Sequence, residues 1–135
     1  MVHSLVYVSA SDRRLTGVDL QRLLEQSRRH NGAHQLTGLL LYRAGTFLQF
    51  LEGGEADVED LFSSIEVDER HHDVVLVRRA TRPHRQFSSW TMAYGDVDLS
   101  STKPVQVEMR APNGPAPQTA DEAAFVRELL ELFDS

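Results

Sequence analysis

The chain has 135 residues, 41% of them hydrophobic and 25% charged, which is enough for one compact domain with its own core. Its formal net charge of −6 argues against general binders of nucleic acid or anionic membranes, because both need a basic surface. The absence of cysteine excludes disulfides, thiolate nucleophiles and thiolate metal sites. No secretion signal or membrane-spanning run is apparent, so we expect a cytoplasmic protein.

The first half of the chain predicts three strands and one helix. A β-branched and aromatic run over residues 5–8 predicts a strand. A helix follows from an N-cap at Thr16 to about His30, and Asn31-Gly32 is expected to end it because both residues tolerate the left-handed conformation. Strands over residues 37–43 and 46–52 come next, joined so closely that they should form an antiparallel hairpin.

The second half adds a helix and two strands to this plan. Acidic residues after Gly53-Gly54 mark a helix whose apolar stripe ends at Ile65. Strands over residues 74–77 and 87–94 complete the order βαββαββ. This order predicts an α+β, ferredoxin-like fold, with a mixed five-stranded sheet and both helices on one face.

The composition changes after residue 97. Residues 98–118 end in a run rich in proline and glycine and are predicted to be a linker. Residues 119–135 are predicted to form an amphipathic helix. The apolar stripe of this helix, from Phe125 to Phe133, must be covered by the domain or by a partner. We therefore expect a domain over residues 1–97 and a homodimer or higher homo-oligomer.

One polar side chain lies in the middle of an apolar strand, in the run Phe47-Leu48-Gln49-Phe50-Leu51. Strand alternation places Gln49 on one face with Phe47 and Leu51. An unpaired carboxamide in such a place costs about 1–3 kcal/mol per group, so a partner must donate to its oxygen and another must accept from its amide hydrogens.

Six separated pieces of the sequence stand in a fixed order over about the first hundred residues. They are Leu5-Val6-Tyr7-Val8-Ser9, Ser27-Arg28-Arg29-His30-Asn31, Leu36-Thr37-Gly38-Leu39-Leu40-Leu41-Tyr42, Phe47-Leu48-Gln49-Phe50-Leu51-Glu52-Gly53, Asp68-Glu69-Arg70-His71 and Phe87-Ser88-Ser89-Trp90-Thr91-Met92. Together they resemble the BLUF domain, the blue-light sensor that uses FAD. The resemblance implies a photoreceptor that is not an enzyme and that binds FAD, or FMN, without a covalent bond.

The resemblance also implies roles for particular side chains. Tyr7 resembles the tyrosine that donates an electron and a proton to the excited flavin, and Gln49 the glutamine that bridges this tyrosine to the flavin. Asn31 resembles the asparagine that hydrogen-bonds the flavin's C4 carbonyl and N3 edge. Trp90 and Met92 resemble the pair that passes the light signal outward.

Further cofactor contacts are implied on both helices, on the strands and in one loop. They are Ser9, Leu23, Ser27, His30, Phe47, Ile65, Asp68, Arg70 and His71. On periodicity alone Leu23, Ser27 and Ile65 are simply core positions. The three loop residues are equally consistent with a solvated charged loop. Two positions depart from the family pattern, since His30 stands where many relatives have asparagine and Ser64 where some have a basic residue.

The mechanism implied by the resemblance is a photochemical switch. Blue light excites the oxidised flavin, Tyr7 donates an electron with a proton relayed through Gln49, and the radical pair recombines after the amide has changed its hydrogen bonds. The absorption should shift to the red and return in the dark. The output is expected to be association with a protein partner that the sequence does not name, and not with nucleic acid or a membrane.

Two other classes of function stay open at this point. The first is a flavin-dependent redox enzyme, against which the missing nicotinamide fingerprint and the absence of cysteine weigh. The second is a metal-dependent hydrolase that uses Glu52, Asp68, His71 and His72. These histidines are adjacent, so one helix could not present both to the same ion.

Overall fold

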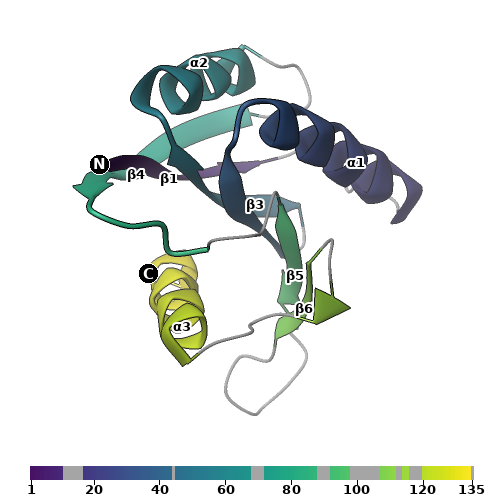
Figure 1. The fold of residues 1–135 in the computed structure, drawn as a ribbon. Helices are drawn as coiled ribbons and strands as arrows, with labels where there is room; N and C mark the ends of the chain where they lie inside the picture. The colour runs from purple at the N-terminus through teal and green to yellow at the C-terminus, as the bar shows by residue number, and fades with distance from the viewer. Residues whose placement is uncertain are drawn as a thin grey trace.

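The computed structural model describes residues 1–10, 17–43, 45–67, 72–87, 92–97, 107–111, 114–115 and 120–134. Its elements are β1 (Val2–Ala10), α1 (Gly17–Ala33), β2 (Thr37–Arg43), β3 (Thr46–Gly53), α2 (Glu55–Glu66), β4 (His72–Arg82), β5 (Ala93–Val97), β6 (Val107–Ala111), β7 (Gly114–Pro115) and α3 (Ala120–Asp134). The predicted α+β class is confirmed (Figure 1). None of the helices in these ranges is long and apolar enough to cross a membrane.

The strands form one mixed sheet in the order β4-β1-β3-β2-β5-β6-β7. β2 and β5 are parallel, and the other neighbouring pairs are antiparallel. The predicted count of five strands is wrong, because β6 and β7 lie in the stretch 98–118 for which we expected a linker. β6 pairs along the edge of β5, so the backbone hydrogen bonds offered by that edge, rather than local apolar content, account for its position.

Three strands differ from their predicted bounds by more than one residue. β1 has 9 residues, Val2–Ala10, instead of the four predicted over 5–8. β4 has 11 residues instead of the four predicted over 74–77, because it continues beside β1 through a polar stretch in which Arg78 and Arg79 lie opposite Val6 and Leu5. β5 begins at Ala93, not at Phe87. The β2–β3 hairpin has the predicted short connection, with Arg43 paired to Thr46.

Helix α1 ends three residues later than predicted. The left-handed residue is Gln35, with φ of 57°, rather than a residue of the Asn31-Gly32 pair. The N–H of Leu36 donates to the carbonyl of Asn31 at 2.8 Å, the pattern of a Schellman motif, and Leu36 is buried beyond it. Asn31 therefore lies within the helix, and its side chain lies on the same face of α1 as that of Ser27. The predicted N-cap, Thr16, lies outside the described residues.

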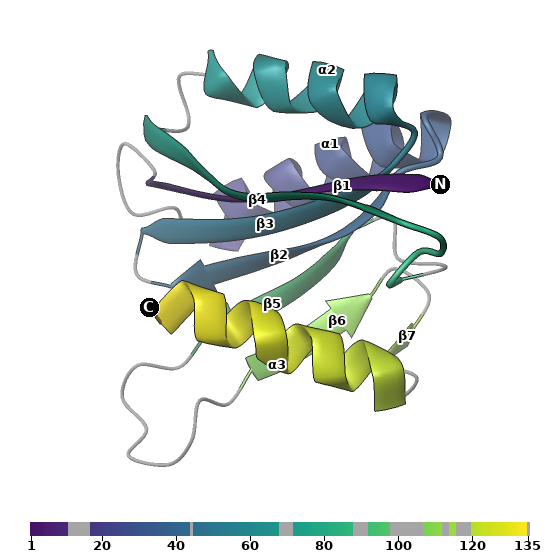
Figure 2. The ribbon, with the colours of Figure 1, turned by 90° about the vertical axis from the view of Figure 1, so that its left-hand side faces the viewer.

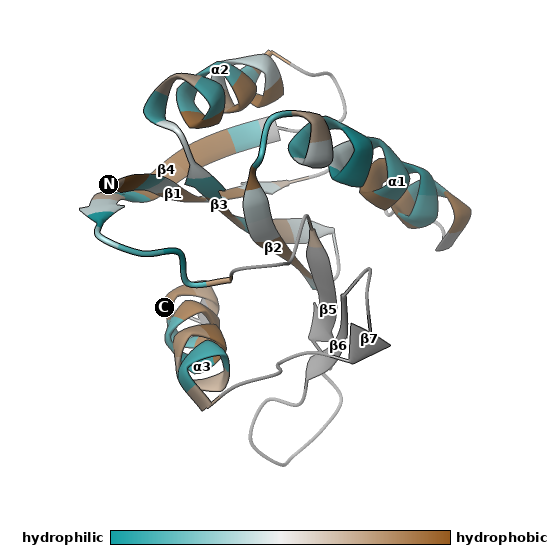
Figure 3. Cartoon of the chain, in the orientation of Figure 1, coloured by the Kyte–Doolittle hydropathy of each residue, from teal (hydrophilic) through white to brown (hydrophobic). Residues whose placement is uncertain are grey.

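The helices form two layers, with α1 and α2 on one face of the sheet and α3 on the other (Figures 1 and 2). Each face carries its own apolar cluster, and hydrophobic and hydrophilic residues alternate along all three helices, as expected for helices that bury one side (Figure 3). The face under α1 and α2 includes Leu5, Tyr7, Leu40 and Leu51.

Helix α3 covers the opposite face of the sheet with its own apolar stripe. Phe125, Val126, Leu129 and Phe133 are buried against strand residues of that face. The rings of Phe50 and Phe125 meet edge to face, with centroids 4.8 Å apart. The stripe is thus covered within the chain, which removes the reason for expecting a homo-oligomer.

We expect the variant Leu129→Ala to lower the free energy of unfolding by about 2–5 kcal/mol, because it leaves a cavity between α3 and the sheet. Leu129 is 0% exposed. Denaturant unfolding followed by circular dichroism measures the change. The exposed Arg127→Ala on the same helix is the control and should change stability by less than about 0.5 kcal/mol. Equal midpoints for Leu129→Ala and the parent protein would contradict the packing of α3.

Candidate functional site

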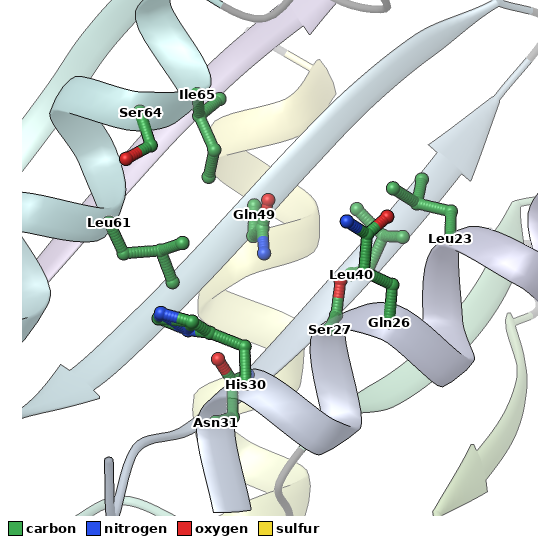
Figure 4. Close-up of a pocket in the computed structure, with 10 residues that line it drawn as sticks. All are labelled: Leu23, Gln26, Ser27, His30, Asn31, Leu40, Gln49, Leu61, Ser64 and Ile65. Atoms are coloured by element: carbon green, nitrogen blue, oxygen red, sulfur yellow. The ribbon is translucent and has the colours of Figure 1, made fainter. Parts of the chain in front are cut away.

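A cavity of about 230 Å³ lies between α1, α2 and the sheet. The residues that line it are Leu23, Gln26, Ser27, His30, Asn31, Leu40, Gln49, Leu61, Ser64 and Ile65 (Figure 4). Both helices contribute residues at helical spacing: positions 23, 26, 27, 30 and 31 of α1 and positions 61, 64 and 65 of α2 share one face each. Leu40 and Gln49 form the floor as direct partners in β2 and β3.

Tyr7 lies beside Gln49 in the sheet beneath this cavity. The two residues are direct partners in the antiparallel pair β1–β3, although 42 positions separate them in the sequence. The Tyr7 hydroxyl donates a hydrogen bond to Oε1 of Gln49. Tyr7 is 0% and Gln49 6% exposed, so water is excluded from this bond. Tyr7 is therefore the donor that the buried carboxamide requires.

The surroundings of Tyr7 keep its phenol neutral. Burial raises the pKa of Tyr7 well above its usual value, and the ring of Phe62 packs on it with the two centroids 5.1 Å apart. A neutral phenol donates to the amide oxygen and so fixes the orientation of Gln49. The amide nitrogen of Gln49 accordingly lies on the side of His30 and Asn31 (Figure 4). The amide hydrogens of Gln49 are thus available to a molecule in the cavity.

His30 brings a second polar group to the cavity. Its Nδ1 is buried and has no hydrogen-bond partner among the described residues. The ring stacks on His34 with centroids 4.4 Å apart, and Nδ1 of His34 lies 3.3 Å from Oδ1 of Asp57. Burial lowers the pKa of His30, His34 lowers it further, and Asp57 opposes both. A neutral imidazole therefore faces the cavity at neutral pH.

The structure describes ten of the predicted site residues and brings six of them together around the cavity. Six of them line the cavity: Leu23, Ser27, His30, Asn31, Gln49 and Ile65. Ser9 and Phe47 are buried cross-strand partners of each other but do not line it. Met92 is buried in the same apolar cluster as Tyr7. The predicted positions Asp68, Arg70, His71 and Trp90 lie outside the described residues.

Sequence reasoning left out two cavity residues for which signals were present. Gln26 stands three positions after Leu23 and four before His30, so helical spacing alone places it on the same face. Leu40 follows from the two-residue hairpin connection, which sets it opposite Gln49. Leu61 and Ser64 of α2 also line the cavity. Leu61 belongs to the apolar stripe that is predicted to end at Ile65, and Ser64 is the position at which some relatives have a basic residue.

The metal-dependent alternative finds no support in the parts of the chain that the structure describes. Of its four residues only Glu52 has a described side chain, and its carboxylate accepts backbone N–H groups of Gln86 and Phe87, each at 2.8 Å. No group of three or more histidine, cysteine, aspartate or glutamate residues within the described ranges could hold a metal ion.

Several known proteins are similar to this chain over about 70–75% of its length. The photoactivated adenylate cyclase subunit beta of Euglena gracilis is 33% identical over 102 residues, which make up 75% of this chain and 12% of that protein. BlrB, a BLUF protein solved in its dark state, is 30% identical with a TM-score of 0.66, over 70% of this chain and 72% of that one. BlrP1 of Klebsiella pneumoniae, solved with FMN and cyclic diGMP, is 36% identical with a TM-score of 0.66, over 71% and 26%.

A family model matches residues 2–93, which contain every element from β1 to α2 and therefore all the residues that line the cavity. The chain spans 12% of the length of the Euglena protein. The match agrees with the six sequence pieces and favours a sensor over a flavin-dependent redox enzyme. The chain belongs to the BLUF family, the sensors of blue light using FAD.

Proposed function

We propose that this chain is a blue-light photoreceptor that binds FAD without a covalent bond in the cavity between α1 and α2. A flavin ring is flat, apolar at one end and polar at the other. The apolar surface of the cavity comes from Leu23, Leu61 and Ile65 on the helices and from Leu40 on the floor. Its polar groups include the amide of Gln49 and the imidazole of His30, whose buried Nδ1 has no partner among the described residues. An imidazole nitrogen buried without a protein partner among the described residues is suited to a hydrogen bond with a ligand.

The observation that carries the proposal is the buried hydrogen bond from Tyr7 to Gln49 at the cavity floor. When bound, the flavin supplies absorption of blue light and an excited state that takes up an electron. Tyr7 is a side chain that can give up an electron together with its phenolic proton, and Oε1 of Gln49 lies within hydrogen-bond reach of that proton. Tyr7 regains both when the electron returns, so the cycle leaves no net oxidation.

The amide of Gln49 can then act as a two-state element. A phenol oxygen accepts hydrogen bonds as well as donating them, so Tyr7 can pair with either end of the amide. Turning the amide over exchanges Oε1 and Nε2 and replaces a donor with an acceptor on the side of the cavity. Because both residues are buried, each arrangement is held by hydrogen bonds that water does not replace.

The choice of FAD rests on the description of the family, and FMN remains compatible with the cavity because the flavin ring is common to both. BlrP1, solved with FMN, is a similar protein in which the shorter cofactor was present. We further propose that the output is a change in association with a protein partner. Extraction of the cofactor and its separation by chromatography distinguishes FAD from FMN.

We expect the flavin-loaded protein to shift its absorption slightly to the red under blue light and to return in the dark, without net reduction. Tyr7→Phe and Gln49→Ala should still bind flavin and should lose the shift, since each removes one half of the buried hydrogen bond. Absorption spectra before, during and after illumination measure this.

The matched control is Tyr42→Phe, which removes a second buried hydroxyl, one that has no hydrogen-bond partner within the described residues. This variant should keep the light-induced shift. A parent protein that cannot be loaded with flavin, or a Tyr7→Phe variant that still shifts, would contradict the proposed function.

The raised pKa of Tyr7 predicts an alkaline loss of stability. The folded state holds the phenolic proton of Tyr7 more tightly than the unfolded state. The contribution of the neutral phenol to the free energy of unfolding is therefore complete below about pH 10, and it is lost as the pH rises toward the pKa of Tyr7 in the folded state. The loss should reach about 1.4 kcal/mol for each pH unit in that window. Denaturant midpoints measured at increasing pH should fall less steeply for Tyr7→Phe, and parallel profiles would refute the assignment.

A further inference from the structure

The connection from β4 to β5 is held at both of its described ends by charged side chains from other elements. At its start, the carboxylate of Glu52 accepts the N–H groups of Gln86 and Phe87, each at 2.8 Å, and Glu52 is 1% exposed. Arg85 adds a bond of 2.6 Å to the carbonyl of Gln35. This end is therefore fixed to the end of β3 and to the loop that follows α1.

At the other end, Nε of Arg28 donates to the backbone carbonyl of Met92 at 3.0 Å. Arg28 is on α1, directly after the cavity residue Ser27. The guanidinium of Arg28 is partly removed from water in this contact, and this burial lowers its pKa. A charged donor in such a position forms a stronger hydrogen bond than a neutral one.

Met92 is the last residue before β5, and the parallel ladder with β2 starts immediately after it, where Ala93 pairs with Leu39 and Tyr94 with the cavity residue Leu40. The side chain of Met92 is 0% exposed and packs in the cluster that contains Tyr7 and Leu24. The contact from Arg28 thus joins the helical wall of the cavity to the residue that directly precedes β5, the strand paired with β2.

We propose that Arg28 is a positioning residue that couples the helical wall of the cavity to the start of β5, through its hydrogen bond to the Met92 carbonyl. The inference rests on the proposed function, because it takes light-driven change in the cavity as its input. At the first end, the N–H groups of Gln86 and Phe87 bind Glu52, which is outside the cavity lining, whereas at the second end the carbonyl of Met92 binds Arg28 on α1 itself. A displacement of α1 would therefore act directly on Met92, and on the first end only through the loop that follows α1.

The test follows the methyl group of Met92 by NMR in protein labelled at the methionine methyl carbons. The chain has three methionines, so the Met92 signal is identified by substitution. In the flavin-loaded parent protein, illumination should shift this signal together with the absorption. In Arg28→Gln the absorption shift should remain and the light-induced change at Met92 should be lost. Arg28→Lys, which keeps the charge, should recover part of that change.

The matched control is Arg29→Gln, which removes the neighbouring and exposed arginine of α1 and should leave both signals as in the parent protein. A Met92 signal that still responds to light in Arg28→Gln overturns the inference, as does loss of the absorption shift in both Arg28 variants, which would place Arg28 in the photochemistry. A parent protein whose absorption shifts while Met92 stays unchanged refutes the coupling and leaves the photoreceptor standing. A parent protein without any absorption shift refutes the proposed function itself.

Discussion

A carboxamide at the centre of a sheet is stable only with hydrogen-bond partners, and the site depends on how this chain satisfies that constraint. Antiparallel pairing of β1 with β3 places Tyr7 opposite Gln49, and the neutral phenol donates to the amide oxygen. The amide nitrogen is left on the side of the cavity (Figure 4). A single buried bond therefore determines which hydrogen-bonding group the protein offers to a ligand.

The two faces of the sheet are covered by different helices, and one of them bears the cavity. One face lies under α1 and α2 and bears the cavity, and the other is sealed by α3 (Figure 2). Neighbouring residues of one strand point to opposite faces, so Gln49 lies at the cavity floor while Leu48 and Phe50 pack on the side of α3. The backbone around Gln49 therefore contributes to the cavity floor on one face and to the packing against α3 on the other.

Much of the site could be predicted because it depends on short-range patterns. Strand alternation places Gln49 with Phe47 and Leu51, and helical spacing gathers Leu23 and Ser27 on one face. The end of α1 could not be located in this way, because Gln35 adopts the left-handed conformation although Gly32 suits it better. Ending the helix at this point buries Leu36, the residue after Gln35. Burial depends on how the whole chain packs, so the local sequence does not reveal it.

By itself the sequence determined the α+β class, the β2–β3 hairpin, the buried faces of the helices and the family, since periodicity, turn chemistry and motifs act within a few residues. Tertiary structure decided that Tyr7 meets Gln49, that Glu52 binds the backbone of Gln86 and Phe87, and that residues 107–111 join the sheet. These contacts join segments that are far apart in the chain. They depend on which strands pair and in which register, and that is decided only when the sheet assembles.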